Sequence, residues 1–243
     1  MNRKYALVTG ASRGIGRAAA LALAEAGYNL AITCSRDTDG LDITRGLISE
    51  YSRDCITGVF DAGDFDECSE FTNKVLDRFG RLDVLVNNAG ISYIGLLQDM
   101  SFTDWNRVIS TNLTSVFNMC RLVIPSMVHE KSGHIINISS VWGNTGAACE
   151  AAYSASKGGI NALTRALGKE LAPSNIAVNA IACGVVDTDM NRCFSDEERE
   201  ALKGEIPAGR FASPKEIAQM VLYLASSTTY LTGQVITIDG GWI

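Results

Sequence analysis

The sequence has only two histidines, His129 and His134, and its seven cysteines include no Cys-x-x-Cys pair. The cysteines are scattered, odd in number and do not cluster with either histidine. Zinc sites are built from such clusters, so the pattern indicates that no zinc site is present. Reduced thiols in the cytosol are the simplest interpretation.

An excess of positive charge is also missing. The formal net charge is -6 and the pI is about 5.0, whereas binding to a nucleic-acid backbone requires a basic face. No apolar run reaches membrane-spanning length, and the opening MNRKYALVTG has no apolar signal-peptide core. We therefore expect a cytoplasmic protein with neither nucleic acid nor membrane as a partner.

Internal repeats, low-complexity tracts and Pro/Gly-rich linkers are absent as well, so residues 1–243 are expected to form a single domain. Apolar runs alternate with helical patterns throughout, which is typical of parallel strands joined by helical crossovers. We predict an α/β fold, a single doubly wound Rossmann-type domain with a seven-stranded parallel sheet flanked by helices. The predicted strands are 5–9, 29–34, 56–60, 82–87, 134–139, 176–182 and 234–239, and the predicted helices are 14–26, 41–53, 64–79, 103–129, 152–172, 196–203 and 214–226.

One polar interruption, residues 187–212, separates the last two strands and contains its own short charged helix. Long segments of this kind often cover a binding site. We expect this segment to be a candidate substrate lid.

The first predicted strand leads into a glycine-rich turn, TGASRGIG, with Gly10, Gly14 and Gly16 spaced as G-x-x-x-G-x-G. Glycines allow a tight turn close to a pyrophosphate, and the following helix directs free N–H groups at the anion. A plain loop is the alternative, but the order of strand, turn and helix favours a phosphate-binding turn.

The second strand ends without a carboxylate at its tip, in Cys34-Ser35-Arg36. Sites for NAD usually carry an acid here for the ribose 2'-hydroxyl. Arg36 and Arg13 are instead suited to a 2'-phosphate, which favours NADP(H). Asp37 is the counter-argument, because it is placed to bond a 2'-hydroxyl, and the arginines are alternatively solvated loop residues.

Three further strand ends border the same edge of the predicted sheet. Asp61 follows the third strand and is suited to the adenine amino group, to a helix N-cap region, or to both. The sequence Asn87-Asn88-Ala89-Gly90 follows the fourth and either leaves room for a ribose or forms a plain tight turn. The loop 183–188 after the sixth strand is expected to border the nicotinamide.

Ser140, Tyr153 and Lys157 form the candidate catalytic group. Lys157 follows Tyr153 by four residues, so both lie on one helix face, where a cation lowers the pKa of a phenol from about 10. Ser140 comes from the end of an apolar strand and is placed to bond the same substrate oxygen. An ordinary surface Tyr and Lys pair is the alternative. Asn112, a poor helix former in the middle of helix 103–129, is a candidate buried polar residue.

Together these segments resemble the short-chain dehydrogenase/reductase family over essentially the whole chain, through TGASRGIG, NNAG, STNL, ISS, YSASK and IDGGW. Within it, the chain is most similar to the bacterial reductases of 3-oxoacyl-[acyl carrier protein]. The resemblance implies NADPH-dependent reduction of a β-keto thioester in fatty acid synthesis, by a homotetramer whose substrate is small or carried on an acyl carrier. The alternatives are a family member acting on another ketone or alcohol, such as a steroid, sugar or small diketone, and a sensor that binds the cofactor without chemistry.

The resemblance also implies residue roles. Tyr153 is the expected proton donor, Ser140 polarises the carbonyl, Lys157 lowers the pKa of Tyr153 and binds the nicotinamide ribose, and Asn112 holds a water for proton resupply. The expected contacts of the cofactor, beyond Tyr153 and Lys157, are Gly10, Ser12, Arg13, Gly14, Ile15, Gly16, Arg36, Asp61, Ala62, Asn88, Gly90, Val186 and Thr188.

Two departures from the family pattern stand out. The family commonly has Pro-Gly where this chain has Cys183-Gly184, and since Cys does not restrict φ we expect a looser loop. Docking of an acidic carrier requires cations beside the pocket, for which Lys131 and Arg121 are the candidates, whereas the end of the catalytic helix, residues 173–175, contains no cation.

Overall fold

A parallel seven-stranded sheet in the order β3-β2-β1-β4-β5-β6-β7 forms the centre of the protein. The computed structural model describes residues 4–51, 53–192 and 194–243, so Cys193 lies outside the described residues. The prediction of a doubly wound seven-stranded sheet is confirmed. The strands are β1 (Lys4–Val8), β2 (Tyr28–Cys34), β3 (Cys55–Val59), β4 (Val84–Asn87), β5 (Gly133–Ser140), β6 (Ile176–Cys183) and β7 (Val235–Ile238).

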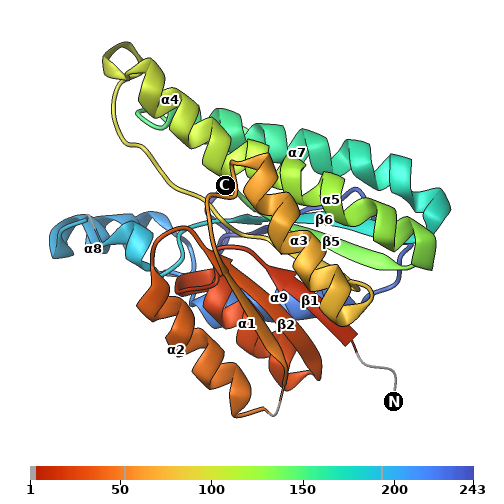
Figure 1. Cartoon of the computed structure of the whole chain (residues 1–243). Helices are drawn as coiled ribbons and strands as arrows, with labels where there is room; N and C mark the ends of the chain where they lie inside the picture. Colours follow the sequence, from red (N-terminus) through yellow and green to blue (C-terminus); the bar gives the residue numbers. More distant parts are fainter. Residues whose placement is uncertain (1–3, 52, 193) are drawn as a thin grey trace.

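Helices cover both faces of this sheet (Figure 1). The first group packs on one face and consists of α1 (Gly14–Glu25), α2 (Thr38–Ser49) and α9 (Pro214–Ser226). The second group lies on the other side, where α3 (Phe65–Phe79), α5 (Ser115–Glu130) and α7 (Ala151–Leu171) pack on the sheet and α4 (Phe102–Ile109) packs on α7. The remaining α-helices are the short α6 (Trp142–Thr145) and α8 (Asp196–Glu205), and α8 projects from one side of the sheet in Figure 1.

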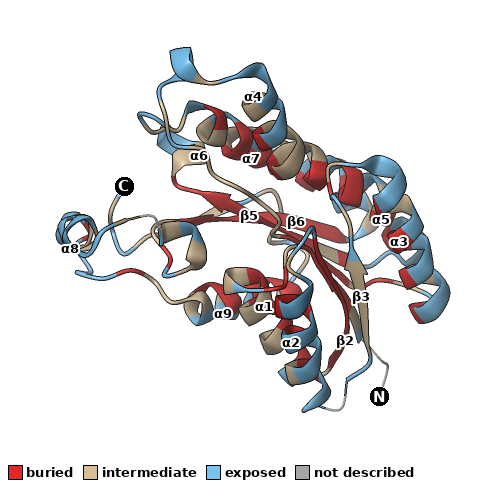
Figure 2. Cartoon of the chain, turned by 60° about the vertical axis from the view of Figure 1, so that its left-hand side comes forward, coloured by how far each residue is buried: buried red, intermediate tan, exposed pale blue. Residues whose placement is uncertain are grey.

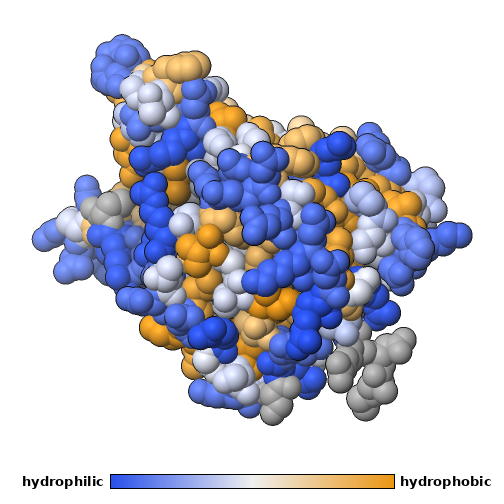
Figure 3. Space-filling view, viewed as in Figure 1, coloured by the Kyte–Doolittle hydropathy of each residue, from blue (hydrophilic) through white to orange (hydrophobic). Residues whose placement is uncertain are grey.

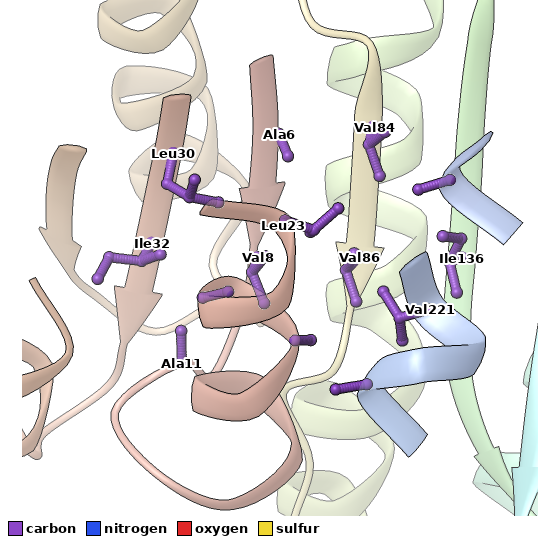
Figure 4. Close-up of a cluster of buried hydrophobic side chains, with 14 of the residues drawn as sticks. Ala6, Val8, Ala11, Leu23, Leu30, Ile32, Val84, Val86, Ile136 and Val221 are labelled. Atoms are coloured by element: carbon purple, nitrogen blue, oxygen red, sulfur yellow. The ribbon is translucent and has the colours of Figure 1, made fainter. Parts of the chain in front are cut away.

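The strand residues alternate strictly between two hydrophobic cores. On β1, Ala6 and Val8 belong to the core beneath α1 and α9, while Leu7 belongs to the core beneath α3, α5 and α7. Successive side chains on a strand point to opposite faces, so a sheet covered on both sides needs apolar residues at every position. Figure 4 shows the first core, where Leu23 of α1 and Val221 of α9 lie over the strands.

Burial decreases from the sheet outwards, and the outer faces of the helices are exposed (Figure 2). On the face seen in Figure 1, hydrophobic residues are interspersed with hydrophilic ones (Figure 3). Within the described residues, no helix combines the length and the apolar character needed to cross a bilayer.

Two predicted helices differ from the structure. The predicted helix 41–53 begins at Thr38, because Asp37 caps α2 through the Gly40 N–H, and it ends at Ser49; residue 52 lies outside the described residues. The predicted helix 103–129 is divided by a π-helical turn, η2 (Ser110–Thr114), which contains Asn112. Such turns insert an extra residue into a helix and often occur at functional sites.

Candidate active site

The order of the strands changes direction between β1 and β4, and this point lies at the start of the candidate site. In an open parallel sheet, ligands bind beyond the carboxyl ends of the strands at such a point. The glycine-rich turn 10–16 follows β1 directly here, and the segment 88–90 follows β4.

Two glycines of the turn, Gly10 and Gly16, leave little or no space for a side chain. Gly10 and Gly14 have φ values of +65° and +56°, which favour glycine. A Cβ at Gly16 would clash with the Gly10 carbonyl and lie 2.5 Å from Asn88 Nδ2. Ile15 packs on the core, and the N-cap residue Arg13 makes no side-chain capping bond to α1. The first N–H groups of α1 therefore fit an anion.

Asn88 joins the two strand ends. Its side-chain amide donates to the Thr9 and Gly10 carbonyls, each at 2.9 Å. In return, the Thr9 hydroxyl accepts from the backbone N–H groups of Asn88 at 3.0 Å and Ala89 at 3.1 Å. The side chain of Asn88 thus shapes the turn.

At the end of β2, Arg36 is exposed whereas Asp37 is engaged. The Asp37 carboxylate accepts from Gly40 N–H at 3.1 Å and lies 4.0 Å from Arg13 Nη1. Hydrogen bonds from the Ser12 hydroxyl and Gly40 hold the pKa of Asp37 below its ordinary value. Arg13 also pairs with Asp189 at 3.4 Å. Among the candidates for a 2'-phosphate, Arg36 is therefore the one that is not in an ion pair with Asp37 or Asp189.

Asp61 and Ala62 follow β3 at the same edge of the sheet. One oxygen of Asp61 accepts from Gly63 N–H at 2.9 Å, and the Ala62 carbonyl accepts from Asn118 Nδ2 at 3.1 Å. The N-cap of α3 is Asp64. Asp61 therefore lies in the N-cap region of α3, where its N–H donates to Glu67 at 2.8 Å, without being the N-cap residue itself.

Hydrogen bonds join the loop after β6 to the neighbouring strands. Strand β6 extends through Cys183, whose carbonyl accepts from Val141 N–H at 3.0 Å, and Gly184 N–H donates to the Ile238 carbonyl at 2.9 Å. Val186 is buried and pairs with Ala212. Thr188 lies against the glycine turn, since a Cβ at Gly14 would be 3.3 Å from its methyl group.

The three candidate catalytic residues converge at the carboxyl ends of β5 and β6. Ser140 is the last residue of β5, and Tyr153 and Lys157 occupy successive turns of α7. Lys157 Nζ lies 5.5 Å from the centroid of the Tyr153 ring and donates to the Ile138 carbonyl at 2.8 Å. Lys157 is only 4% exposed. The alternative of an ordinary surface pair is therefore wrong.

Burial dominates the protonation of this group. It raises the pKa of Tyr153 well above 10, against a hydrogen bond with the Ser140 side chain that lowers it. It lowers the pKa of Lys157 to about 8. Burial is thus the largest influence on both pKa values, because removing a group from water disfavours its charged form.

Asn112 fastens the segment after β4 to α7. Its side chain pairs with both backbone groups of Ile91, accepting at 2.8 Å and donating at 2.9 Å, and donates to Ser156 Oγ at 3.0 Å. The π-helical turn brings this buried amide to Ile91. The predicted buried Asn with backbone bonds is confirmed.

Gly90 connects the glycine turn to the catalytic group. A Cβ at Gly90 would lie 3.6 Å from Lys157 Nζ and 3.4 Å from Asn112 Oδ1, and one at Gly10 would lie 3.0 Å from the neighbouring Ala89 Cα. The glycine turn and Lys157 therefore lie next to each other through the segment 88–90.

The candidate lid, residues 187–212, is held at both ends. Arg199 donates to Asp187 at 2.8 Å and its guanidinium lies 4.9 Å from the centroid of the buried Phe211 ring. Between these contacts, α8 begins at a capping box formed by Ser195 and Glu198. These contacts join α8 to the residues that flank it, and the role of the segment as a lid stays a prediction.

Arg17 and Glu150 are two further residues near the site that the sequence patterns do not reveal. Arg17 donates to the carbonyls of Ser12 and Gly40 and so links the glycine turn to α2. Glu150 precedes α7, and its charge acts on Tyr153. Its position three residues before the tyrosine is the one signal that points to it.

Comparisons with known proteins agree with this geometry. A family model described as short chain dehydrogenase matches residues 4–199. Proteins named 3-oxoacyl-[acyl-carrier-protein] reductase FabG are similar in Staphylococcus aureus (43% identity, 98% of this chain and 97% of the relative) and Thermotoga maritima (40%, 99% and 98%).

A solved structure shares the fold. It is described as a putative short-chain alcohol dehydrogenase from Sinorhizobium meliloti, with a TM-score of 0.93, 36% identity and coverage of 100% of this chain and 97% of that one. The resemblance predicted from the motifs is confirmed, and the chain is an oxidoreductase that belongs to the short-chain dehydrogenase family.

Proposed function

We propose that this chain is an NADPH-dependent reductase that converts a 3-oxoacyl thioester to its 3-hydroxyacyl form in fatty acid synthesis, with Tyr153 as the proton donor. The observation that carries the proposal is the convergence of Tyr153, Ser140 and Lys157 beside the glycine turn. The names of the similar bacterial reductases support the acyl substrate.

The residues between β1 and β4, where the strand order changes direction, fit a dinucleotide. Glycines at positions 10, 14 and 16 leave space for a pyrophosphate, and the N-terminus of α1 provides its N–H groups. Arg36 is exposed to meet a 2'-phosphate, while Asp37 is engaged as a helix cap. When bound, the cofactor supplies the hydride. Asp61, Ala62, Val186 and Thr188 border the remainder of the proposed cofactor site.

The chain itself supplies orientation and a proton. Tyr153 is protonated at neutral pH because burial raises its pKa, and a proton donor to a carbonyl oxygen must be in that form. Ser140 bonds the same oxygen and holds it against the phenol. Lys157, cationic below about pH 8, stabilises the phenolate left after transfer. Asn112 holds the segment at Ile91 in place and is proposed to bind the water that resupplies the proton.

An acyl carrier would dock through residues other than Lys131. This lysine follows α5 and lies at the start of β5, whereas Ser140 is at its far end. Eight strand residues separate the two ends by roughly 23 Å. The prediction that Lys131 lies beside the pocket is therefore wrong, because Lys131 and Ser140 of the same chain lie at opposite ends of β5.

Assembly into a homotetramer is part of the proposal. Phe117 on α5 is 50% exposed and Tyr230, before β7, is 96% exposed. Large apolar side chains in such positions are typical of subunit interfaces. Light scattering on the purified protein should give four times the chain mass, and a monomeric mass would contradict this part.

The substrate proposal is tested by following NADPH oxidation with a panel of β-keto thioesters and free ketones. We expect a steep preference for carrier-bound or CoA-bound β-keto substrates. Equal turnover of a free steroid, sugar or diketone would instead assign the chain to another carbonyl within the family.

A further inference from the structure

Asn161 is a buried polar residue on the same face of α7 as the candidate catalytic residues. It follows Lys157 by four residues and Tyr153 by eight, so the three side chains lie along one side of the helix. Asn161 is only 2% exposed. Burying an amide is costly unless its polar atoms are hydrogen-bonded, so the partners of Asn161 indicate what this residue does.

Both polar atoms of the Asn161 side chain bond residues that flank Ser140. Its oxygen accepts from Ser139 Oγ at 2.6 Å, and its nitrogen donates to Asn144 Oδ1 at 2.9 Å. Ser139 precedes Ser140 on β5, and Asn144 lies on α6, which begins two residues after Ser140. Asn161 therefore holds the chain on both sides of Ser140.

The short helix α6 joins Ser140 closely to α7. The backbone N–H of Trp142 donates to Ser140 Oγ at 3.2 Å. A Cβ at Gly143 would lie 2.7 Å from the carbonyl carbon of Lys157, so the backbones of the two helices are in close contact. A shift of α6 relative to α7 would therefore move Ser140 relative to the side chains on that face of α7.

A second buried hydrogen bond joins the same strand to the same helix farther from Ser140. Asn137 Nδ2 donates to Thr164 Oγ1 at 2.9 Å, and both residues are fully buried. Asn137 lies two residues before Ser139 on β5, and Thr164 lies three residues after Asn161 on α7. The two bonds allow the general packing of β5 on α7 to be separated from the placement of Ser140.

We infer that Asn161 is a positioning residue, which holds Ser140 in register with Tyr153 so that both hydroxyls reach one carbonyl oxygen. The inference rests on the proposed function and deepens it. A reaction that needs two groups on one atom is sensitive to small displacements, and a shift of about 1 Å costs up to roughly 10²-fold in rate. Loss of the Asn161 bonds should therefore lower kcat, while NADPH binding beside the glycine turn stays unchanged.

Asn161→Leu keeps the approximate size of the side chain and removes both bonds. We expect its kcat to fall about tenfold or more with the best carbonyl substrate of the panel above, while its affinity for NADPH stays within about twofold of the parent. Thr164→Val removes the second bond and is the matched control, which should lose stability in urea without losing kcat. Asn144→Ala, at an exposed residue, removes one of the two Asn161 bonds and should lower kcat by a smaller factor.

The same substitution in a Ser140→Ala background distinguishes positioning from a general loosening of the fold. Without a hydroxyl to position, Asn161→Leu should change kcat by less than about twofold, whereas a loosened fold would lower kcat equally in both backgrounds. Equal losses in the two backgrounds, or an unchanged kcat beside the parent Ser140, would overturn the inference. If Asn161→Leu does not fold, Asn144→Ala takes its place in both backgrounds.

Crystal structures of the parent and of the variant that folds test the inference without turnover, and they decide it where Ser140→Ala has no measurable rate. We expect Ser140 Oγ to move by about 0.5 Å or more relative to the Tyr153 hydroxyl. An unchanged Ser140 would overturn the inference. A displaced Ser140 in the variant, together with a parent that reduces no β-keto thioester, would overturn the proposed function alone.

Discussion

The part of the site beside β1 and the part beside β5 are built differently. Around β1, glycines and backbone groups form the surface, and the Asn88 side chain donates to the Thr9 and Gly10 carbonyls. Around β5, buried polar side chains project into the site, and burial shifts the pKa values of Tyr153 and Lys157 in opposite directions.

The difference shows how one sheet edge separates binding from chemistry. A surface of backbone groups binds an anion without burying a charge of its own, and it fails when a side chain is added. A buried group of side chains can exchange protons, and it fails when an atom is removed. Substitutions in the two parts should therefore have separable effects.

The largest expected effect comes from removing one oxygen on the β5 side. Tyr153→Phe should reduce the rate of β-keto thioester reduction about 10²–10⁴-fold, because the proton donor is lost while the ring remains. Steady-state NADPH oxidation measures this. Tyr223→Phe, at a 59% exposed position on α9, is the matched control and should be neutral.

On the β1 side, Arg36→Asp should weaken NADPH binding about 10 to 100-fold and affect NADH much less, because a charged hydrogen bond to the 2'-phosphate is lost. Fluorescence titration with both cofactors measures the ratio. The exposed Arg53, at the other end of the strands, provides Arg53→Asp as a control for net charge. An unchanged ratio would place the 2'-phosphate elsewhere.

Adding one carbon to the glycine turn should have a smaller effect than the substitutions above, and this effect should include a loss of stability. Gly16→Ala introduces a Cβ 2.5 Å from Asn88 Nδ2, so we expect a loss of about 1–3 kcal/mol of stability together with weaker cofactor binding. Gly46→Ala, where a Cβ meets nothing within 4 Å on α2, should be neutral or stabilising. Urea unfolding compares the two, and equal stability losses would contradict the crowded turn.

The smallest effect is a pH dependence from the β5 side. Lys157 has a folded-state pKa of about 8 against 10.5 when unfolded, so burying the cation costs stability in full below pH 8. The cost declines as the pH rises from 8 toward 10.5. Between pH 7 and pH 9 the parent should therefore gain about 1 kcal/mol relative to Lys157→Met. A gap in unfolding free energy that stays constant with pH would show that Lys157 is not desolvated.

The β1 side was the easier of the two to predict from sequence. The glycines of its turn are required by the local backbone conformation and by close neighbours, so the sequence alone indicates the turn. The alternation of apolar runs with helical patterns indicated the sheet correctly. The exception is Asp37, whose role as the cap of α2 the sequence did not reveal. Caps at the start of a helix shift its boundary, which explains the early start of α2.

The β5 side depends on contacts between distant segments. Spacing placed Tyr153 and Lys157 on one helix face, as the structure confirms, but spacing contains no information about burial, which raises the pKa of Tyr153. The division of helix 103–129 follows from Asn112 bonding Ile91, a tertiary contact. The hydrogen bonds that join the Cys183 loop to Val141 and to β7 are likewise nonlocal, so the sequence does not reveal them.

The most direct test of the separation between the two parts is an NADPH titration of Tyr153→Phe and Gly16→Ala beside their turnover. We expect Tyr153→Phe to bind NADPH like the parent while its turnover is lost, and Gly16→Ala to bind NADPH more weakly while turnover at saturating cofactor is largely retained. Loss of NADPH binding in Tyr153→Phe, or its full turnover, would contradict the division of the site into a backbone surface that binds and a buried side-chain group that reacts.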